Sequence, residues 1–201
     1  MLEIIFYSLS GFFMKLSDDS YDQKNEKSLA IIFGILSGLT IGYLVVTSLD
    51  AAYIFMGILI GTLLSKKIDG IHHIITSTVF LFIALIFKIP SIRIVTLVLC
   101  SFAAFIDEIG NDNRSISKIS KFFGLFFKFR FSLKIVVLVL SIFGLIQMFY
   151  INFEIPGLEF MKFYTIFYFM FFELSYEVAG LKFETIYNGL SRFSRVLGAV
   201  N

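Results

Sequence analysis

The chain has no tryptophan, a single cysteine and few charged residues, and each shortage narrows what it can be. A lone cysteine, Cys100, excludes an intramolecular disulfide. Charged residues make up 16% of the 201 residues and hydrophobic residues 58%, whereas soluble domains carry about 25% charged residues. No hydrophilic stretch is long enough for a separate soluble domain. An ordinary soluble protein is therefore excluded, and tyrosine must replace tryptophan at the membrane interface.

Long apolar runs take the place of the missing charge, with a mean hydropathy of +0.89. They predict an all-α, polytopic integral membrane bundle, because a run of about 17–25 apolar residues can cross the hydrocarbon core as a helix. We expect about seven spans, or about six if the second and third form a broken hairpin. Their ranges are roughly 1–17, 28–48, 51–65, 71–88, 91–107, 131–151 and 159–178. Residues 1–178 would form the transmembrane domain, and residues 179–201 an amphipathic cytoplasmic tail.

The basic residues predict how the bundle lies in the membrane. Most of them fall in the segments 15–27, 66–70, 107–130 and 179–201. The segments on the opposite side hold only Lys88, Arg93 and Lys162. The positive-inside rule then places the N-terminus outside and the C-terminus in the cytoplasm, as expected for a multi-pass protein of the cell membrane.

The basic stretch 115–130 alternates Lys and Arg with Ile and Phe at helical spacing. It predicts an amphipathic helix on an anionic leaflet rather than a nucleic-acid site. We therefore expect membrane lipids as partners and no nucleic acid; the oligomeric state stays open.

Acidic residues cluster at one end of four apolar runs. The clusters are Asp18, Asp19 and Asp22; Asp69; Asp107, Glu108 and Asp112; and Glu173 with Glu177. If alternate runs cross the bilayer in the same direction, all four clusters collect at the cytoplasmic face. Acids at membrane depth are energetically costly, so they are functional candidates by default.

The first cluster has the D-D-x-x-D spacing, which places its outer acids within about one helical turn. Carboxylates in this arrangement suit Mg²⁺, with Mn²⁺ or Zn²⁺ as alternatives. The expected metal ligands are Asp18, Asp19, Asp22, Asp107, Glu108 and Asp112, with Asp19 and Asp107 as catalytic residues. A solvated cytoplasmic loop explains the first cluster, taken alone, at least as well.

Lysines near these acids complete the expected site. Lys15, Lys66 and Lys67 would bind phosphate as point charges. A metal held close by would neutralise a diphosphate leaving group. The leading hypothesis is therefore a metal-assisted intramembrane enzyme acting on a lipid phosphate or isoprenyl diphosphate.

The two acidic motifs at 18–22 and 107–112 resemble the paired Asp-rich motifs of UbiA-type intramembrane prenyltransferases. In that family, such motifs hold Mg²⁺ and an isoprenyl diphosphate beneath a lipid-facing channel. The family has more spans and a longer chain, and its first motif usually begins with Asn-Asp, where this chain has Ser17 and Asp18. The resemblance is confined to the two motifs.

Other residues support a different class of protein. Glu173 and Glu177 lie four residues apart in an otherwise apolar run, as a cation or proton-coupled transporter would need. Asp69 and His73 share the same spacing and form an alternative cation or proton site, although an interfacial turn explains them about as well. A small structural or insertion-assisting subunit is the third hypothesis. No H-E-x-x-H, G-x-S-x-G or Gly-rich phosphate loop is present, so enzymatic activity stays open.

Overall fold

The computed structural model of the chain is all-α and describes residues 2–68, 70–113, 120–149 and 154–198, with the backbone alone for residues 191–198. Its helices are α1 (Leu2–Asp22), α2 (Lys27–Thr47), α3 (Leu49–Leu64), α4 (Ile71–Phe87), α5 (Ile94–Asp112), α7 (Lys121–Lys128), α8 (Phe131–Phe149) and α9 (Thr165–Gly198). Both prolines of the chain, Pro90 and Pro156, lie in connections between helices, where they break no helical hydrogen bond. The helices therefore follow the apolar runs closely.

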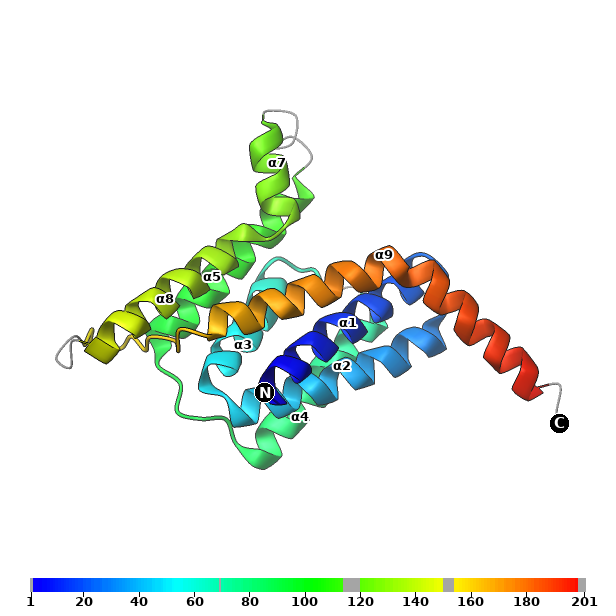
Figure 1. Ribbon diagram of the computed structural model, residues 1–201, viewed down its shortest axis with the longest axis horizontal. Helices are drawn as coiled ribbons and strands as arrows, with labels where there is room; N and C mark the ends of the chain where they lie inside the picture. Colours follow the sequence, from blue (N-terminus) through cyan, green and yellow to red (C-terminus); the bar gives the residue numbers. More distant parts are fainter. Residues whose placement is uncertain (1, 69, 114–119, 150–153, 199–201) are drawn as a thin grey trace.

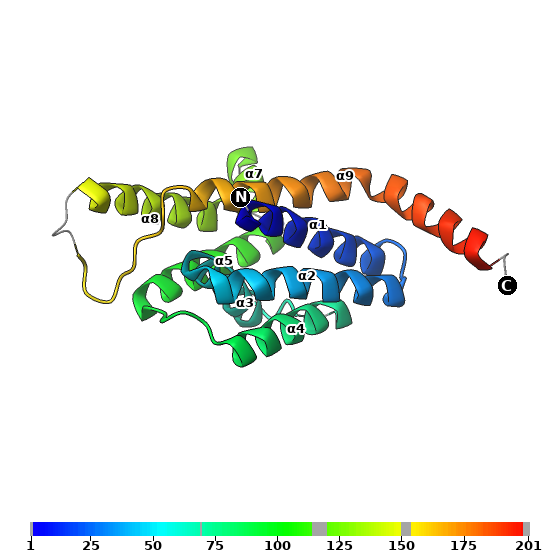
Figure 2. The same ribbon diagram turned by 60° about the horizontal axis from the view of Figure 1, so that its bottom comes forward.

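The described helices pack as two connected groups (Figures 1 and 2). In one group, α2 lies between α1 and α4, and α9 lies along α1. In the other, α5 lies between α3 and α8. The groups are joined where α2 passes into α3 through the single residue Ser48. Helix α7 projects from the bundle and buries none of its residues (Figure 1).

Glycines at intervals of four residues allow the closest helix contacts. Gly34, Gly38 and Gly42 of α2 face α4, and Gly57 and Gly61 of α3 face α5. A Cβ atom at Gly38 would lie 2.8 Å from a backbone oxygen of α4, and one at Gly61 would lie 2.7 Å from a Cβ of α5. Small residues let helix backbones approach in this way. Their spacing of four residues is the sequence signal for this kind of helix packing.

Two buried acids accept hydrogen bonds at the beginning of other helices. Asp107 of α5 accepts the backbone N–H groups of Ser132 and Leu133, each at 2.9 Å, in the first turn of α8. Asp50 of α3 accepts the backbone N–H of Lys162 at 2.9 Å, just before α9. The first N–H groups of a helix have no partner within it, and the helix dipole favours a negative charge there. These contacts connect α5 to α8 and α3 to α9.

Helix α9 differs in extent from the sequence expectation. A span over 159–178 with a separate tail is predicted, but one helix runs from Thr165 to Gly198. Its start is fixed by Asp50, which also accepts a hydrogen bond from the Thr165 hydroxyl. Beyond residue 178, Phe183 is buried against Leu16 and Phe33, which keeps the helix packed on α1 and α2. That the tail lies on a cytoplasmic membrane surface stays a prediction.

Three described helices, α2, α5 and α8, are long and apolar enough to cross a membrane by length and composition. Helices α3 and α4 are also apolar, but they are shorter, at 16 and 17 residues. Large apolar side chains cover the outer surface of α4, where Leu85 is 79% exposed and Phe87 69% exposed. Such a surface suits lipid better than water. The number of spans and their orientation stay predictions.

Candidate functional site

A cavity of about 550 Å³ lies where the ends of α1, α3 and α5 meet the beginning of α4. Its lining has two chemically different parts. Polar and charged side chains, most of them near helix ends, form the first part: Asp18, Asp22, Lys66, Lys67, His73, Glu108, Asp112, Arg130 and Tyr176, with the hydroxyl side chains of Ser17, Thr62, Ser65, Thr76 and Ser77. Apolar side chains from within the helices form the second part: Met14, Ile41, Phe55, Ile58, Leu59 and Phe80. The cavity therefore joins a charged region to an apolar one.

Four of the sequence-predicted acids come together in this lining. Asp18 and Asp22 come from the end of α1, and Glu108 and Asp112 from the end of α5. The helices bring their ends together because α1, α3 and α5 run in the same direction and the helices between them run back. Asp69 falls outside the described residues.

The two residues predicted to be catalytic lie outside this lining. Asp19 is buried at 4% exposure and pairs with Lys15 at 3.0 Å, beside Gly180 of α9. Asp107 is buried at 1% exposure and uses both carboxylate oxygens to cap α8. Lys15, predicted to bind phosphate, is also drawn away from the cavity by Asp19. Catalytic roles for Asp19 and Asp107 therefore remain predictions without a place in the cavity.

Basic side chains line the charged part of the cavity and pair with its acids. Lys67, which follows α3, forms ion pairs with two acids of α5, Glu108 at 2.9 Å and Asp112 at 2.7 Å. Arg130, just before α8, contacts the other oxygen of Glu108 at 3.1 Å. Burial lowers the pKa of Lys67, but the ion pairs with Asp112 and Glu108 outweigh burial and raise it above its ordinary value. Lys67 is therefore cationic at neutral pH, and Lys66 and Arg130 add two further basic side chains to the lining.

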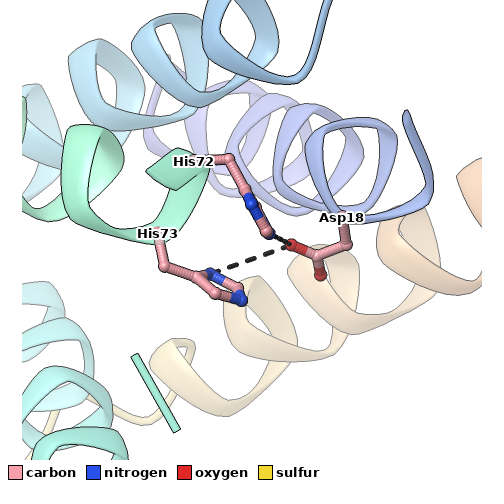
Figure 3. Close-up of side chains that lie close together, drawn as sticks. All are labelled: Asp18, His72 and His73. Carbon is pink, nitrogen blue, oxygen red and sulfur yellow. Dashed lines mark ion pairs between the residues drawn. The ribbon is translucent and has the colours of Figure 1, made fainter. Parts of the chain in front are cut away.

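A second group at the cavity wall consists of Asp18 and two consecutive histidines of α4, His72 and His73 (Figure 3). Asp18 Oδ1 lies 3.4 Å from His72 Nε2 and 3.9 Å from His73 Nδ1. One possible ligand atom from each residue lies within 4.8 Å of the other two. The second oxygen of Asp18 accepts a hydrogen bond of 2.9 Å from the Tyr176 hydroxyl. These three side chains can therefore hold a metal ion.

The local fold explains why both imidazoles reach the same carboxylate. Gly70 begins α4, and a Cβ atom there would lie 2.4 Å from His72 Nδ1, so the glycine leaves room for the ring. The His72 ring contacts two other rings at tilted angles, with centroids 4.7 Å from the Tyr21 ring and 4.0 Å from the His73 ring. His72 itself is only 2% exposed. Packing therefore holds the ring beside Asp18.

The acids proposed for transport lie elsewhere. Glu173 pairs with Lys134 of α8 at 3.0 Å, and both side chains are largely buried. Glu177, one turn further along α9, is exposed. Of the alternative cation or proton site, only His73 lines the cavity among the residues described.

Sequence reasoning missed three residues of this site. The sequence alone gives His72 and Tyr176 no functional role, and it predicts a surface helix for Arg130. Their position in the sequence could have identified two of them, because His72 and Arg130 lie at the end of the bundle where the acids gather. Which partner each side chain meets depends on contacts between α1, α4, α5 and α9, which are distant in sequence.

Fold and site together define an all-α bundle with membrane-type helices and a cavity that is charged in one part and apolar in the other. No protein-family model matches the chain, and neither a curated protein nor a solved structure matches it.

Proposed function

We propose that this protein is a multi-pass membrane enzyme that acts on a lipid phosphate or isoprenyl diphosphate with the help of a divalent metal ion. The observation that carries the proposal is the two-part lining of the cavity. A lipid phosphate has the same two parts, an anionic headgroup and an apolar chain. The chain would lie against Ile41, Phe55 and Phe80, and the headgroup would lie among the charged side chains.

Three cations support the binding of a phosphate. Lys66, Lys67 and Arg130 all line the charged part of the cavity. Arginine presents a fork of donors to phosphate oxygens, and lysine acts as a point charge. Lys67 and Arg130 are currently shared with Glu108, so a phosphate would compete with a carboxylate for them. A metal ion bound to the headgroup would reduce the repulsion between the phosphate and the Glu108 carboxylate.

The metal has support from the acids of the same lining. Asp18 and Asp22 would supply the one or two carboxylates that Mg²⁺ commonly takes from a protein, and the phosphate would supply further oxygens. The ion would neutralise charge that develops on phosphate oxygens during the reaction. The proposal includes Mg²⁺, as the sequence predicts, and its alternatives Mn²⁺ and Zn²⁺.

The proposed orientation follows from the basic residues rather than from the helices themselves. With the N-terminus outside, the ends of α1, α3 and α5 face the cytoplasm, and the charged part of the cavity opens toward it. A cation transporter has less support, because Glu173 forms an ion pair with Lys134 and Glu177 is exposed.

The experiment is a comparison of lipids that differ only in the phosphate. Detergent-purified protein is incubated with Mg²⁺, Mn²⁺ or Zn²⁺ and an isoprenyl diphosphate, the matching isoprenyl alcohol, or a diacylglycerol phosphate, and the lipids are followed by mass spectrometry. We expect consumption of a phosphorylated lipid that stops when EDTA is added. Consumption of neither phosphorylated lipid with any of the metals would contradict the proposal.

Variants of the cations make the test specific to the cavity. Lys66→Gln and Arg130→Gln are each expected to lower turnover about 10- to 100-fold, because a hydrogen bond to a charged group contributes about 1.5–3 kcal/mol. Lys24→Gln is the matched control, since Lys24 pairs with Glu184 at 2.7 Å and lies outside the cavity lining. Equal losses in the control and in the cavity variants would count against the site.

A further inference from the structure

We infer that Asp18, His72 and His73 form a binding site for one borderline transition-metal ion, of the Zn²⁺ or Mn²⁺ type, rather than for Mg²⁺. The inference deepens the proposed function and rests on it for its catalytic meaning, since the metal would face the same cavity. The binding itself can be tested without any lipid.

The donor set decides the class of metal. Two imidazole nitrogens and one carboxylate oxygen are within reach of one another. Imidazole suits Zn²⁺, Fe²⁺ and other transition ions, whereas Mg²⁺ prefers oxygen donors and retains water. Two histidines and one carboxylate are also a donor set that catalytic metal sites use, with one or more positions left for water or substrate.

The distances already approach those of a bound ion. Metal bonds of about 2.0–2.2 Å at tetrahedral angles separate ligand atoms by roughly 3.3–3.5 Å. Asp18 Oδ1 lies 3.4 Å from His72 Nε2 and 3.9 Å from His73 Nδ1. The ligand atoms of the three residues lie up to 4.8 Å apart, so the His73 side chain, which is 37% exposed, must rotate toward the other two to complete the geometry.

Unsatisfied polar atoms give an independent indication of a ligand. Among the residues described, both ring nitrogens of His72 and the Oδ1 atom of Asp18 are buried and form no hydrogen bond. At 3.4 Å, the two residues are within ion-pair distance but are not hydrogen-bonded to each other. A buried polar atom without a partner is costly, and an unseen ion is one of its recognised explanations. An ion between His72 Nε2 and Asp18 Oδ1 satisfies both atoms at once.

A neighbouring residue fixes the carboxylate. Tyr176 of α9 donates its hydroxyl hydrogen bond to Asp18 Oδ2 at 2.9 Å, which leaves Oδ1 turned toward the histidines (Figure 3). Partners of this kind orient the ligands of metal sites. Asp18 and His73 also line the cavity, so the open positions of the ion would face the lysines proposed to bind phosphate.

The test measures the metal content of the full chain. Protein stripped with EDTA is dialysed against Zn²⁺, Mn²⁺ or Co²⁺ in the presence of excess Mg²⁺, and the bound metal is counted by elemental analysis. We expect one equivalent of transition metal in the wild type and loss of it in His72→Gln and in His73→Ala. Glu184→Gln, which changes an acid that pairs with Lys24 outside the cavity lining, is the matched control and should keep the metal.

Several outcomes would overturn the inference. These are failure of the wild type to retain any of the three ions, displacement of the ion by Mg²⁺, and retention of it in both histidine variants. The unfolding midpoint in EDTA shows which variants are folded. If His72→Gln does not fold, the metal content of His73→Ala tests the inference, since the His73 side chain is partly exposed. Metal binding without lipid turnover would refute only the proposed function.

Gly70→Ala adds a variant that leaves every donor in place. Its Cβ atom would collide with the His72 ring, so metal affinity should fall although all three ligands remain. Unchanged affinity would show that the position of the His72 ring does not matter, contrary to the inference.

Discussion

Two pairs of adjacent acids, Asp18–Asp19 on α1 and Asp107–Glu108 on α5, divide in the same way. In each pair, one residue lines the cavity and the other is buried in a structural contact. Successive residues on a helix point about 100° apart, so two adjacent acids can meet different surroundings, as they do in both pairs. The comparison teaches that an acid at membrane depth is a weak indicator of function until its partner is known. Asp107 meets helix N–H groups, whereas Asp18 meets two histidines and a tyrosine.

The largest expected effect separates the members of the first pair by metal affinity. Asp18→Asn removes one of three proposed ligands, and we expect affinity for Zn²⁺ to fall by more than about 100-fold, since changes outside the ligands alone cause about 10- to 100-fold losses. Asp19→Asn should change it little, because Asp19 pairs with Lys15. Competition with a chromogenic chelator measures both. Equal losses of Zn²⁺ affinity in Asp18→Asn and Asp19→Asn would contradict the different roles given to the two acids.

The second pair is separated by stability. Asp107→Ala removes the acceptor for two N–H groups of α8 and should lower the free energy of unfolding by about 2 kcal/mol. Asp107→Asn should lower it less, because an amide oxygen still caps the helix. Glu108→Ala should lower it by about 1 kcal/mol or less, since its partners Lys67 and Arg130 remain in contact with solvent. Titration with SDS in mixed micelles measures the three variants, and the opposite order would contradict the structural role of Asp107.

A smaller effect is expected from the residue that orients Asp18. Tyr176→Phe keeps the ring but removes the hydroxyl that donates to Asp18 Oδ2. We expect a loss of roughly tenfold in metal affinity, at the lower end of the range for residues that orient ligands. Tyr187→Phe is a suitable control, because its hydroxyl bonds Glu26 far from the cavity lining. An effect of similar size in the control would argue against orientation by Tyr176.

The smallest effect concerns Lys67 and pH. Its pKa is raised in the folded protein, so its ion pairs stabilise the fold fully below the pKa of an unfolded lysine, about 10.4, and the stabilisation is lost as pH rises through the folded value. Because solvent reaches the pairs, the contribution is at most about 1 kcal/mol. Lys67→Gln should therefore remove part of the decline in unfolding midpoint at alkaline pH. If the unfolding midpoints of wild type and Lys67→Gln fell equally with rising pH, the ion pairs of Lys67 would not contribute to stability as expected.

The helices and their closest contacts could be predicted from the sequence. Apolar runs gave the positions of α1 to α5 and α8, because a membrane-type helix needs only continuous hydrophobic length. The glycines of α2 and α3 marked the faces that pack against α4 and α5, because only small residues allow such an approach. The extent of α9 was not predicted, because its start depends on Asp50 and its continuation on contacts with α1.

By itself, the sequence determined that the chain is a bundle of apolar helices and that carboxylates gather at one end of it. Tertiary structure alone decided which carboxylate lines the cavity and which makes a structural contact. The rotation of each helix about its axis is fixed by packing with neighbours distant in the chain, and a change of one residue moves a side chain by about 100°. That rotation places Asp18 beside His72 and Asp107 beneath α8, whereas Asp19 meets Lys15 one turn away on the same helix. Composition and spacing do not specify which acid meets which partner on another helix.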